Sequence, residues 1–154
     1  HVRSRRQRQM CIRDRYKKEY DYILIDCGPS LGMLTINALT AADSVIIPVE
    51  AEYLSAKGME LLLRSVVMTK RKLNPSLKID GILITRVDKR NNLSGQIIKM
   101  VRDAYESLNI FDSQIPERIA VGKSLSKHEL VAGFEKNSDA AIAYKKLAQE
   151  VLAK

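Results

Sequence analysis

The sequence contains no tryptophan, only two cysteines, and no continuous apolar run near the roughly 18 residues that a membrane-spanning helix needs. Two cysteines cannot form a disulfide framework in a chain of 154 residues, which favours a reducing, cytoplasmic compartment. The basic N-terminal residues lack the apolar stretch of a signal peptide, which argues against secretion. The content of 45% hydrophobic and 29% charged residues is typical of one globular domain and excludes a disordered or fibrous chain.

The net charge of +8 is concentrated at the N-terminus. Residues 1–15 carry six Arg and one Asp, a net of +5, so residues 16–154 carry only +3. The first segment has neither helical periodicity nor strand alternation, so we expect a solvated basic arm followed by one domain over 16–154. Residues 10–15 also resemble the translation of a transposase end sequence used to tag sequencing libraries, which predicts a non-native origin. A native DNA-binding arm is the alternative.

Apolar patterning along the remaining chain predicts alternating strands and helices. Short continuous apolar runs are typical of buried parallel strands, and we expect these over 22–26, 44–49, 79–85 and near 110–115. Apolar residues spaced three and four apart predict helices over 31–42, 55–73 and 93–108, and a last helix capped by Ser138. Strands separated by helices of this length form βαβ units. The predicted fold class is therefore α/β, with three layers and a mostly parallel sheet that has helices on both faces.

Two of these helices have apolar faces that we expect to point inward. In the helix over 55–73 the face comprises Met59, Leu62, Leu63, Val66, Val67 and Lys70, and in the last helix it comprises Ala141, Tyr144, Leu147, Ala148, Val151 and Leu152.

The carboxyl ends of parallel strands are where such sheets bind ligands. In this sequence the ends carry Asp26, Glu50 and the residues 85–88. An apolar strand that ends in Asp is the Walker B arrangement of P-loop ATPases, in which the carboxylate holds hydration water of a Mg²⁺ bound to the nucleotide phosphates. The pattern alone is weak, because Asp also follows strands as a turn or cap residue.

The longer pattern around this aspartate carries a family resemblance. Residues 20–32 read Tyr-Asp-Tyr-Ile-Leu-Ile-Asp-Cys-Gly-Pro-Ser-Leu-Gly, and further matching segments are 34–39, 45–49, 73–77, 80–85, 92–94, Ile115-Pro116 and an Ala-Tyr-x-x-Leu-Ala run over 143–148. Together they closely resemble the ParA/Soj-type partition ATPases, which belong to the MinD-like deviant Walker group of P-loop proteins. The resemblance covers residues 16–154.

This resemblance implies a site and a set of partners. Asp26 would hold Mg²⁺ through water, and Cys27, Gly28 and Pro29 would belong to the loop that senses the γ-phosphate of ATP. Thr85, Arg86 and Pro116 would lie where family members approach the adenine. The resemblance further implies ATP-dependent homodimerisation, nonspecific DNA binding, hydrolysis stimulated by a ParB-type adaptor protein, and a cytoplasmic, nucleoid-associated location.

The sequence also departs from the family pattern. Gly28 replaces the first of two prolines, and residues 117–124 replace an Arg-rich segment. The glycine-rich phosphate loop with its two lysines is absent from residues 1–154, so we expect a C-terminal fragment that lacks the N-terminal βα units and does not hydrolyse ATP. Gly122-Lys123-Ser124 does not replace this loop, because Glu117 stands where a P-loop needs glycine.

The basic residues of the body are candidates for DNA contacts. Phosphate neutralisation needs only a basic patch, and the candidates are Arg64, Lys70, Arg71, Lys72, Lys99 and Arg102. The alternative for each is a solvated helix surface. The last helix lacks Phe and Trp, which favours docking on the sheet over membrane binding.

Two other functions remain open from the sequence. One is a non-catalytic ParA-like module that regulates partners or DNA. The other is a related P-loop enzyme, either MinD-like or carboxylate-activating.

Overall fold

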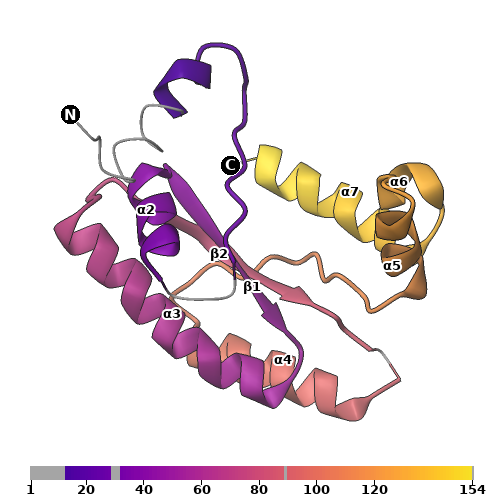
Figure 1. Cartoon of the computed structure of the whole chain (residues 1–154). Coiled ribbons are helices and arrows are strands. Elements are labelled where there is room, and N and C mark those ends of the chain that lie inside the picture. Colours follow the sequence, from indigo (N-terminus) through magenta and orange to yellow (C-terminus); the bar gives the residue numbers. More distant parts are fainter. Residues whose placement is uncertain (1–12, 29–31, 89, 154) are drawn as a thin grey trace. The chain divides into compact units, whose positions relative to one another are not determined.

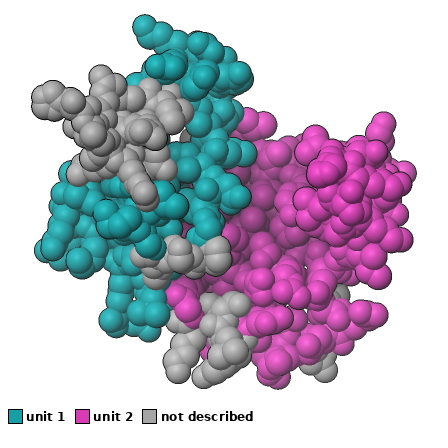
Figure 2. All heavy atoms as spheres, in the orientation of Figure 1, with its two compact units in different colours: residues 1–45, 60–79 teal, residues 46–59, 80–154 magenta. Residues whose placement is uncertain are grey.

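The computed structural model describes residues 13–28, 32–88 and 90–153. Its elements, in chain order, are α2 (Met33–Ala41), β1 (Ser44–Glu50), α3 (Tyr53–Lys72), β2 (Lys78–Thr85), α4 (Asn92–Ala104), α5 (Ile119–Ser126), α6 (Val131–Phe134) and α7 (Asp139–Leu152). The two strands form one parallel sheet (Figure 1). The chain divides into two compact units, residues 1–45 with 60–79 and residues 46–59 with 80–154 (Figure 2).

Most predicted elements are confirmed. The helices expected over 31–42, 55–73, 93–108 and from Ser138, and the strands over 44–49 and 79–85, are all present with ends shifted by a few residues. The segment 110–115 is not a strand. An isolated parallel bridge joins Ile110 to Ile82 of β2, and a second bridge joins Pro116, just after the segment, to Val87, just after β2. The α/β class is confirmed, and the three-layer arrangement stays a prediction.

The buried strand predicted over 22–26 is wrong. These residues belong to no strand and all are exposed, Leu24 to 92%. A strand is stable only where a neighbouring strand satisfies its backbone groups and a packed layer covers its side chains. The described residues supply neither to this segment. An apolar run marks residues that suit a buried strand, but it does not supply the partner strand.

The predicted basic arm lies mostly outside the described residues. Residues 13–16 form one helical turn, and the Arg13 guanidinium donates a 2.7 Å hydrogen bond to the carbonyl oxygen of Ala41. Arg13 is therefore attached to the end of α2 rather than solvated. For residues 1–12 the arm stays a prediction.

The first unit is held together around α2 and the second half of α3. Leu39, Val66 and Leu77 form its buried cluster. Asn74, also buried, donates from its side-chain amide to the carbonyl oxygens of Leu39 at 3.1 Å and Ala42 at 2.7 Å. These bonds satisfy carbonyls at the C-terminal end of α2, which would otherwise lack partners.

The inward face of α3 differs from the prediction in its last turns. Met59 and Val66 are buried as expected, whereas Val67 is 47% exposed and Lys70 is exposed. Thr69 is buried in their place. A threonine hydroxyl can be satisfied by the helix backbone, whereas a buried ammonium would need a counter-charge, so the polar but uncharged residue occupies the inward position.

The second unit packs α7 against β2 and the segment that follows α4. Leu83, Phe111 and Ile115 are the buried cluster, and Ala143, Leu147 and Val151 of α7 pack on it together with Ile46. Ser138 caps α7, since its hydroxyl accepts from the amide of Ala141 at 3.2 Å, as predicted. Of the face predicted for α7, Tyr144, Ala148 and Leu152 are exposed instead. In the described residues no helix is long and apolar enough to cross a bilayer.

Gly81 allows the segment after α4 to lie close to β2. Its φ of 155° is unfavourable for other residues, and a Cβ at this position would lie 2.5 Å from Nδ2 and 2.8 Å from the carbonyl oxygen of Asn109. The Asn109 amide instead donates to the Asp80 carbonyl oxygen at 2.8 Å.

Glu150 fixes the C-terminal half of α7 to the same segment. Its carboxylate accepts from the amides of Asp112 at 3.0 Å and Ser113 at 2.9 Å, and from the Ser113 hydroxyl. Partial burial acts to raise the pKa of the Glu150 carboxyl, but these hydrogen bonds outweigh burial, so the pKa lies below its ordinary value.

We predict that Glu150→Gln destabilises the chain in a pH-dependent way. Because the pKa of Glu150 is lowered on folding, its stabilisation is complete above the unfolded pKa of about 4.3 and is lost as pH falls through the lower folded pKa. Chemical denaturation at pH 7 should show a free energy of unfolding that is lower by about 1 kcal/mol at most, because the exposed part of the side chain weakens its hydrogen bonds. Below the folded pKa of Glu150, the variant and the wild type should have the same free energy of unfolding. Glu106→Gln, which removes an exposed carboxylate, is the control and should change neither the free energy of unfolding at pH 7 nor its dependence on pH. Equal effects of the two substitutions would contradict the proposed anchor.

Candidate functional site

Three segments meet at the carboxyl ends of β1 and β2. The amide of Ala51 donates to the carbonyl oxygen of Thr85 at 3.0 Å, the amide of Val87 to that of Ile115 at 3.1 Å, and the amide of Glu117 to that of Val87 at 3.2 Å. Three of the predicted site residues, Thr85, Arg86 and Pro116, are thereby brought together, Thr85 half-buried and Pro116 buried. We call this region, residues 50–51, 85–88 and 115–118, the rim.

Arg86 links all three segments of the rim. Its guanidinium donates through Nη1 to Glu50 at 3.2 Å and through Nη2 to Glu117 at 3.0 Å, with half of the side chain exposed. The hydrogen bond to Glu117 and the charge of Glu50 both raise the pKa of Arg86. The backbone of Arg86 has a φ of 52°, a left-handed conformation uncommon outside glycine. Such a conformation persists only where surrounding contacts hold it, and it is frequent at functional sites.

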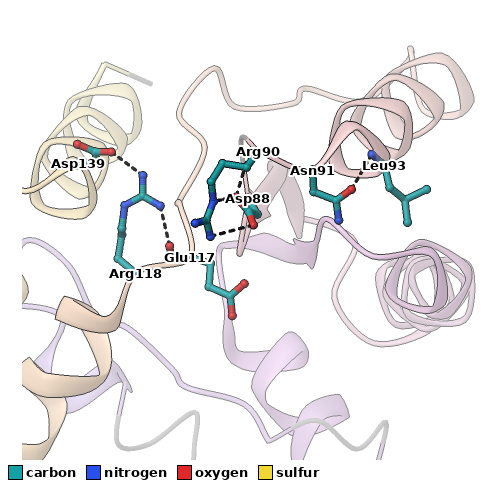
Figure 3. Close-up of polar contacts among 7 residues, drawn as sticks. All are labelled: Asp88, Arg90, Asn91, Leu93, Glu117, Arg118 and Asp139. Carbon is teal, nitrogen blue, oxygen red and sulfur yellow. Dashed lines mark hydrogen bonds and ion pairs between the residues drawn. The ribbon is translucent and has the colours of Figure 1, made fainter.

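The other charged groups of the rim, Asp88 and Arg118, are paired as well (Figure 3). Asp88 forms an ion pair with Arg90 at 3.1 Å, and the hydrogen bonds from Arg90 lower the pKa of Asp88. Arg118 forms an ion pair with Asp139 at 2.7 Å. The Asn91 side chain accepts from the amide of Leu93 at 2.9 Å and so caps α4. Each described cation in this region therefore already has a carboxylate partner.

Glu117, Arg118 and Asp139 were not singled out by sequence analysis as contributors to a site. Residue 117 entered it only as the start of a segment that departs from the family pattern and as the residue that stands where a P-loop needs glycine. The available signal was the opposite charge of Arg86 and Glu117, each of which directly follows the end of an apolar segment. Charge alone does not say which of the many available partners each residue meets, so the pairing became visible only in the structure.

Asp26, Cys27 and Gly28 lie in the exposed extended segment of the first unit. The Cys27 thiol is free, and its partial desolvation together with the neighbouring Asp26 carboxylate raises its pKa. Pro29 lies outside the described residues. No hydrogen bond or ion pair engages the Asp26 side chain within the described part of the chain, and no cluster of three or more metal-ligating side chains occurs there.

The structure confirms that Gly122-Lys123-Ser124 is not a phosphate loop. All three residues lie inside α5, with Lys123 exposed and the Ser124 hydroxyl donating to the carbonyl oxygen of Val121 at 2.9 Å. A phosphate loop must instead precede a helix, so that its free amides can face the ligand.

The six basic residues predicted to contact DNA are all exposed. Arg64 forms an ion pair with Glu60 at 2.7 Å on the surface of α3, and Lys70, Arg71 and Lys72 occupy the last turn of that helix. Lys99 and Arg102 lie on α4, where Lys99 borders a shallow open hollow with Gln96, Met100, Asp103 and Ala104.

Curated relatives match almost the whole chain. It is 42% identical over 137 residues to the sporulation initiation inhibitor protein Soj of Bacillus subtilis, a match covering 89% of this chain and 54% of Soj. It is 38% identical over 152 residues to the chromosome partitioning protein ParA of Caulobacter vibrioides, covering 99% of this chain and 57% of ParA. The chain thus spans about half the length of these relatives.

Solved structures share the fold. Cobyrinic acid a,c-diamide synthase from Mycobacterium smegmatis, with an ATP analogue and magnesium bound, is 33% identical with a TM-score of 0.76, covering 98% of this chain and 55% of the synthase. Apo McdA of Cyanothece, at 19% identity and a TM-score of 0.82, shares the fold over 93% of this chain and 57% of its own. The fold is that of the α/β P-loop ATPases.

Residues 3–79 match the AAA domain family AAA_31. The chain belongs to this family, as a member of its ParA/Soj-type group of partitioning ATPases.

We predict that Arg86 and Glu117 are energetically coupled through an exposed, salt-sensitive ion pair. In a double-mutant cycle of Arg86→Ala and Glu117→Ala, the two losses of stability should sum to more than the loss in the double variant at low salt. The difference should fall towards zero near about 1 M NaCl, because exposed charges are screened. Strictly additive losses at low salt would contradict the pair.

Proposed function

We propose that these residues form the C-terminal portion of a ParA-type DNA partition ATPase. The intact protein hydrolyses ATP with Mg²⁺, dimerises around the bound nucleotides, binds DNA without sequence specificity and responds to a ParB-type adaptor protein. It acts in the cytoplasm, on the nucleoid and away from the membrane. The observation that carries this proposal is the 42% and 38% identity to Soj and ParA, maintained over most of the chain.

The rim supports the nucleotide part of the proposal. In open parallel sheets ligands bind beyond the carboxyl ends of the strands, and Thr85, Arg86 and Pro116 lie together at this place. The related synthase binds an ATP analogue with magnesium.

Asp26 suits a hydrated magnesium ion. Mg²⁺ usually keeps several waters and takes one or two protein carboxylates, with phosphates completing its shell. A single exposed carboxylate with no described ion-pair partner matches that requirement. The ion would neutralise charge on the phosphates, while Asp26 would hold one of its waters and Cys27, Gly28 and Pro29 would form the adjoining loop.

A second candidate function follows from the synthase match. That protein is named for making a diamide from an acid and is 33% identical to this chain, which favours the carboxylate-activating alternative. The two functions differ in what stimulates ATP turnover by the full reading frame. DNA and an adaptor protein should stimulate a partition ATPase, whereas a carboxylic acid and an amine donor should stimulate a carboxylate-activating enzyme.

The ATPase prediction has two parts. Residues 1–154 contain no glycine-rich phosphate loop, so the purified chain should show no Mg-ATP turnover above background. The full reading frame should turn over ATP, and Asp26→Asn should reduce this by about 10- to 100-fold, as expected for a residue that holds a metal-bound water. Asp21→Asn removes the same charge from the same exposed segment and should have little effect. Turnover by the 154-residue chain, or equal activities of the two variants, would contradict the assignment. A reading frame that begins near Tyr16 would instead favour the non-catalytic module.

The DNA prediction concerns the last turn of α3. Replacing Lys70, Arg71 and Lys72 with Ala in the full reading frame should weaken ATP-dependent DNA binding equally for unrelated sequences. The slope of log affinity against log salt should decrease by about 2 to 3, because each phosphate contact contributes nearly one unit. The control for the removal of positive charge is the double variant Lys145→Ala and Lys146→Ala on α7. In this control the slope of log affinity against log salt should equal that of the wild type. A wild-type slope in the α3 variant would assign DNA binding to other residues.

A further inference from the structure

One side of α4 leaves apolar side chains exposed. Leu93 is 53% exposed and Met100 is 42% exposed, whereas Ile97 and Val101 of the same helix are buried. Met100 also lines the shallow hollow of the second unit, whose lining residues all belong to α4. Residues three, four and seven positions apart lie on one side of a helix, so these side chains form a continuous stripe. We call this stripe the α4 face, and it comprises Leu93, Gln96, Lys99, Met100, Asp103 and Ala104.

The α4 face also carries one side chain of each charge. Lys99 and Asp103 are both exposed and lie four positions apart, close enough to meet on the helix surface. Within the described residues neither side chain forms an ion pair or a hydrogen bond. Lysine before an acidic residue is the less favourable order for a pair within a helix, because it opposes the helix dipole. Both charges are therefore available to a partner molecule.

The presence of both charges argues against nucleic acid as that partner. A phosphate bound by Lys99 would lie beside the Asp103 carboxylate, which would repel it. Met100 has no hydrogen-bond donor to offer a phosphate. A protein surface that presents an acidic, an apolar and a basic group in matching positions would satisfy all three residues.

The α4 face of a second copy of this chain is such a surface when the two helices run antiparallel. A twofold axis at the level of Val101 places Lys99 of each copy level with the partner's Asp103, so the same ion pair forms twice. Each Met100 then lies within about 3 Å, along the helix axis, of the level of the partner's Met100. The two thioethers can therefore pack together between the two ion pairs.

We propose that the α4 faces of two copies form a twofold, antiparallel contact with reciprocal Lys99–Asp103 ion pairs around Met100. The contact needs no nucleotide, so this inference does not rest on the proposed function or on its ATP-dependent dimer. It assigns Lys99, a candidate for DNA contacts in the sequence, to a protein partner. A helix of 13 residues is only about 20 Å long, so the interface is small and the association weak.

The test measures self-association of the 154-residue chain by sedimentation equilibrium, at low salt and without nucleotide. The wild type should pass from monomer to dimer between about 10 µM and 1 mM. Lys99→Asp and Asp103→Lys each bring like charges together twice, and each should raise the dissociation constant about 10-fold. Lys145→Asp, which makes the same charge change at an exposed position of α7, is the control and should leave the dissociation constant unchanged.

Exchange of the two charges separates this contact from effects on folding or on net charge. The double variant Lys99→Asp and Asp103→Lys has the net charge of the wild type and forms the same pairs in reverse. Its dissociation constant should return to the wild-type value. An equimolar mixture of the two single variants should form mixed dimers more tightly than either variant associates with itself, because each pair then joins opposite charges.

Three results would overturn the α4 contact. The first is a wild-type chain that stays monomeric up to about 1 mM. The second is a dissociation constant that is the same in the wild type and both single variants, which would assign self-association to another surface. The third is a charge exchange that restores association neither in the double variant nor in the mixture. ATP-dependent dimerisation and DNA binding by the full reading frame are separate measurements, and their loss would leave this contact intact.

Discussion

The position of β2 between two backbone partners is the constraint on which the rim depends. One edge of β2 pairs with β1, and the other receives the segment 109–117, with Gly81 admitting its close approach at Asn109. Because the three segments run parallel, their carboxyl ends meet at one place. The side chains gathered there come from residues up to 67 positions apart, from Glu50 to Glu117.

Ion pairs between side chains then connect the three segments at the rim. Arg86 joins Glu50 and Glu117, while Arg118 continues the connection to Asp139 at the start of α7. At the other end of that helix, Glu150 holds Asp112 and Ser113. The segment 112–118 is thus fixed by β2 along its backbone and by α7 at both ends. Individually such exposed pairs are weak, so the geometry depends mainly on the backbone pairing and the packing of Leu147 and Val151.

Prediction from sequence succeeded where structure is local and failed where it needs a partner. The apolar spacing of α3 and α7, the Ser138 cap and the apolar runs of β1 and β2 all identified real elements. The run over 22–26 has the same composition as a buried strand, yet it belongs to no strand. Its residues fit a strand, but a ladder needs a second chain segment. The need for a packing partner also explains why Tyr144 and Leu152 are exposed. Helical periodicity identifies the apolar face of a helix, but it does not show which part of that face another segment covers.

The sequence by itself determined the family, the helices α2, α3, α4 and α7, the strands β1 and β2 and, through the family resemblance, three residues of the rim, Thr85, Arg86 and Pro116. These properties are encoded in contiguous motifs and in short-range spacing. Only the tertiary structure decided that Arg86 forms ion pairs with both Glu50 and Glu117, and that the Glu150 carboxylate accepts a hydrogen bond from the amide of Ser113. Ion pairs between residues that are distant in the sequence depend on which backbone segments lie side by side. The amino-acid sequence alone does not identify the partner, because it contains many residues of opposite charge for each charged residue.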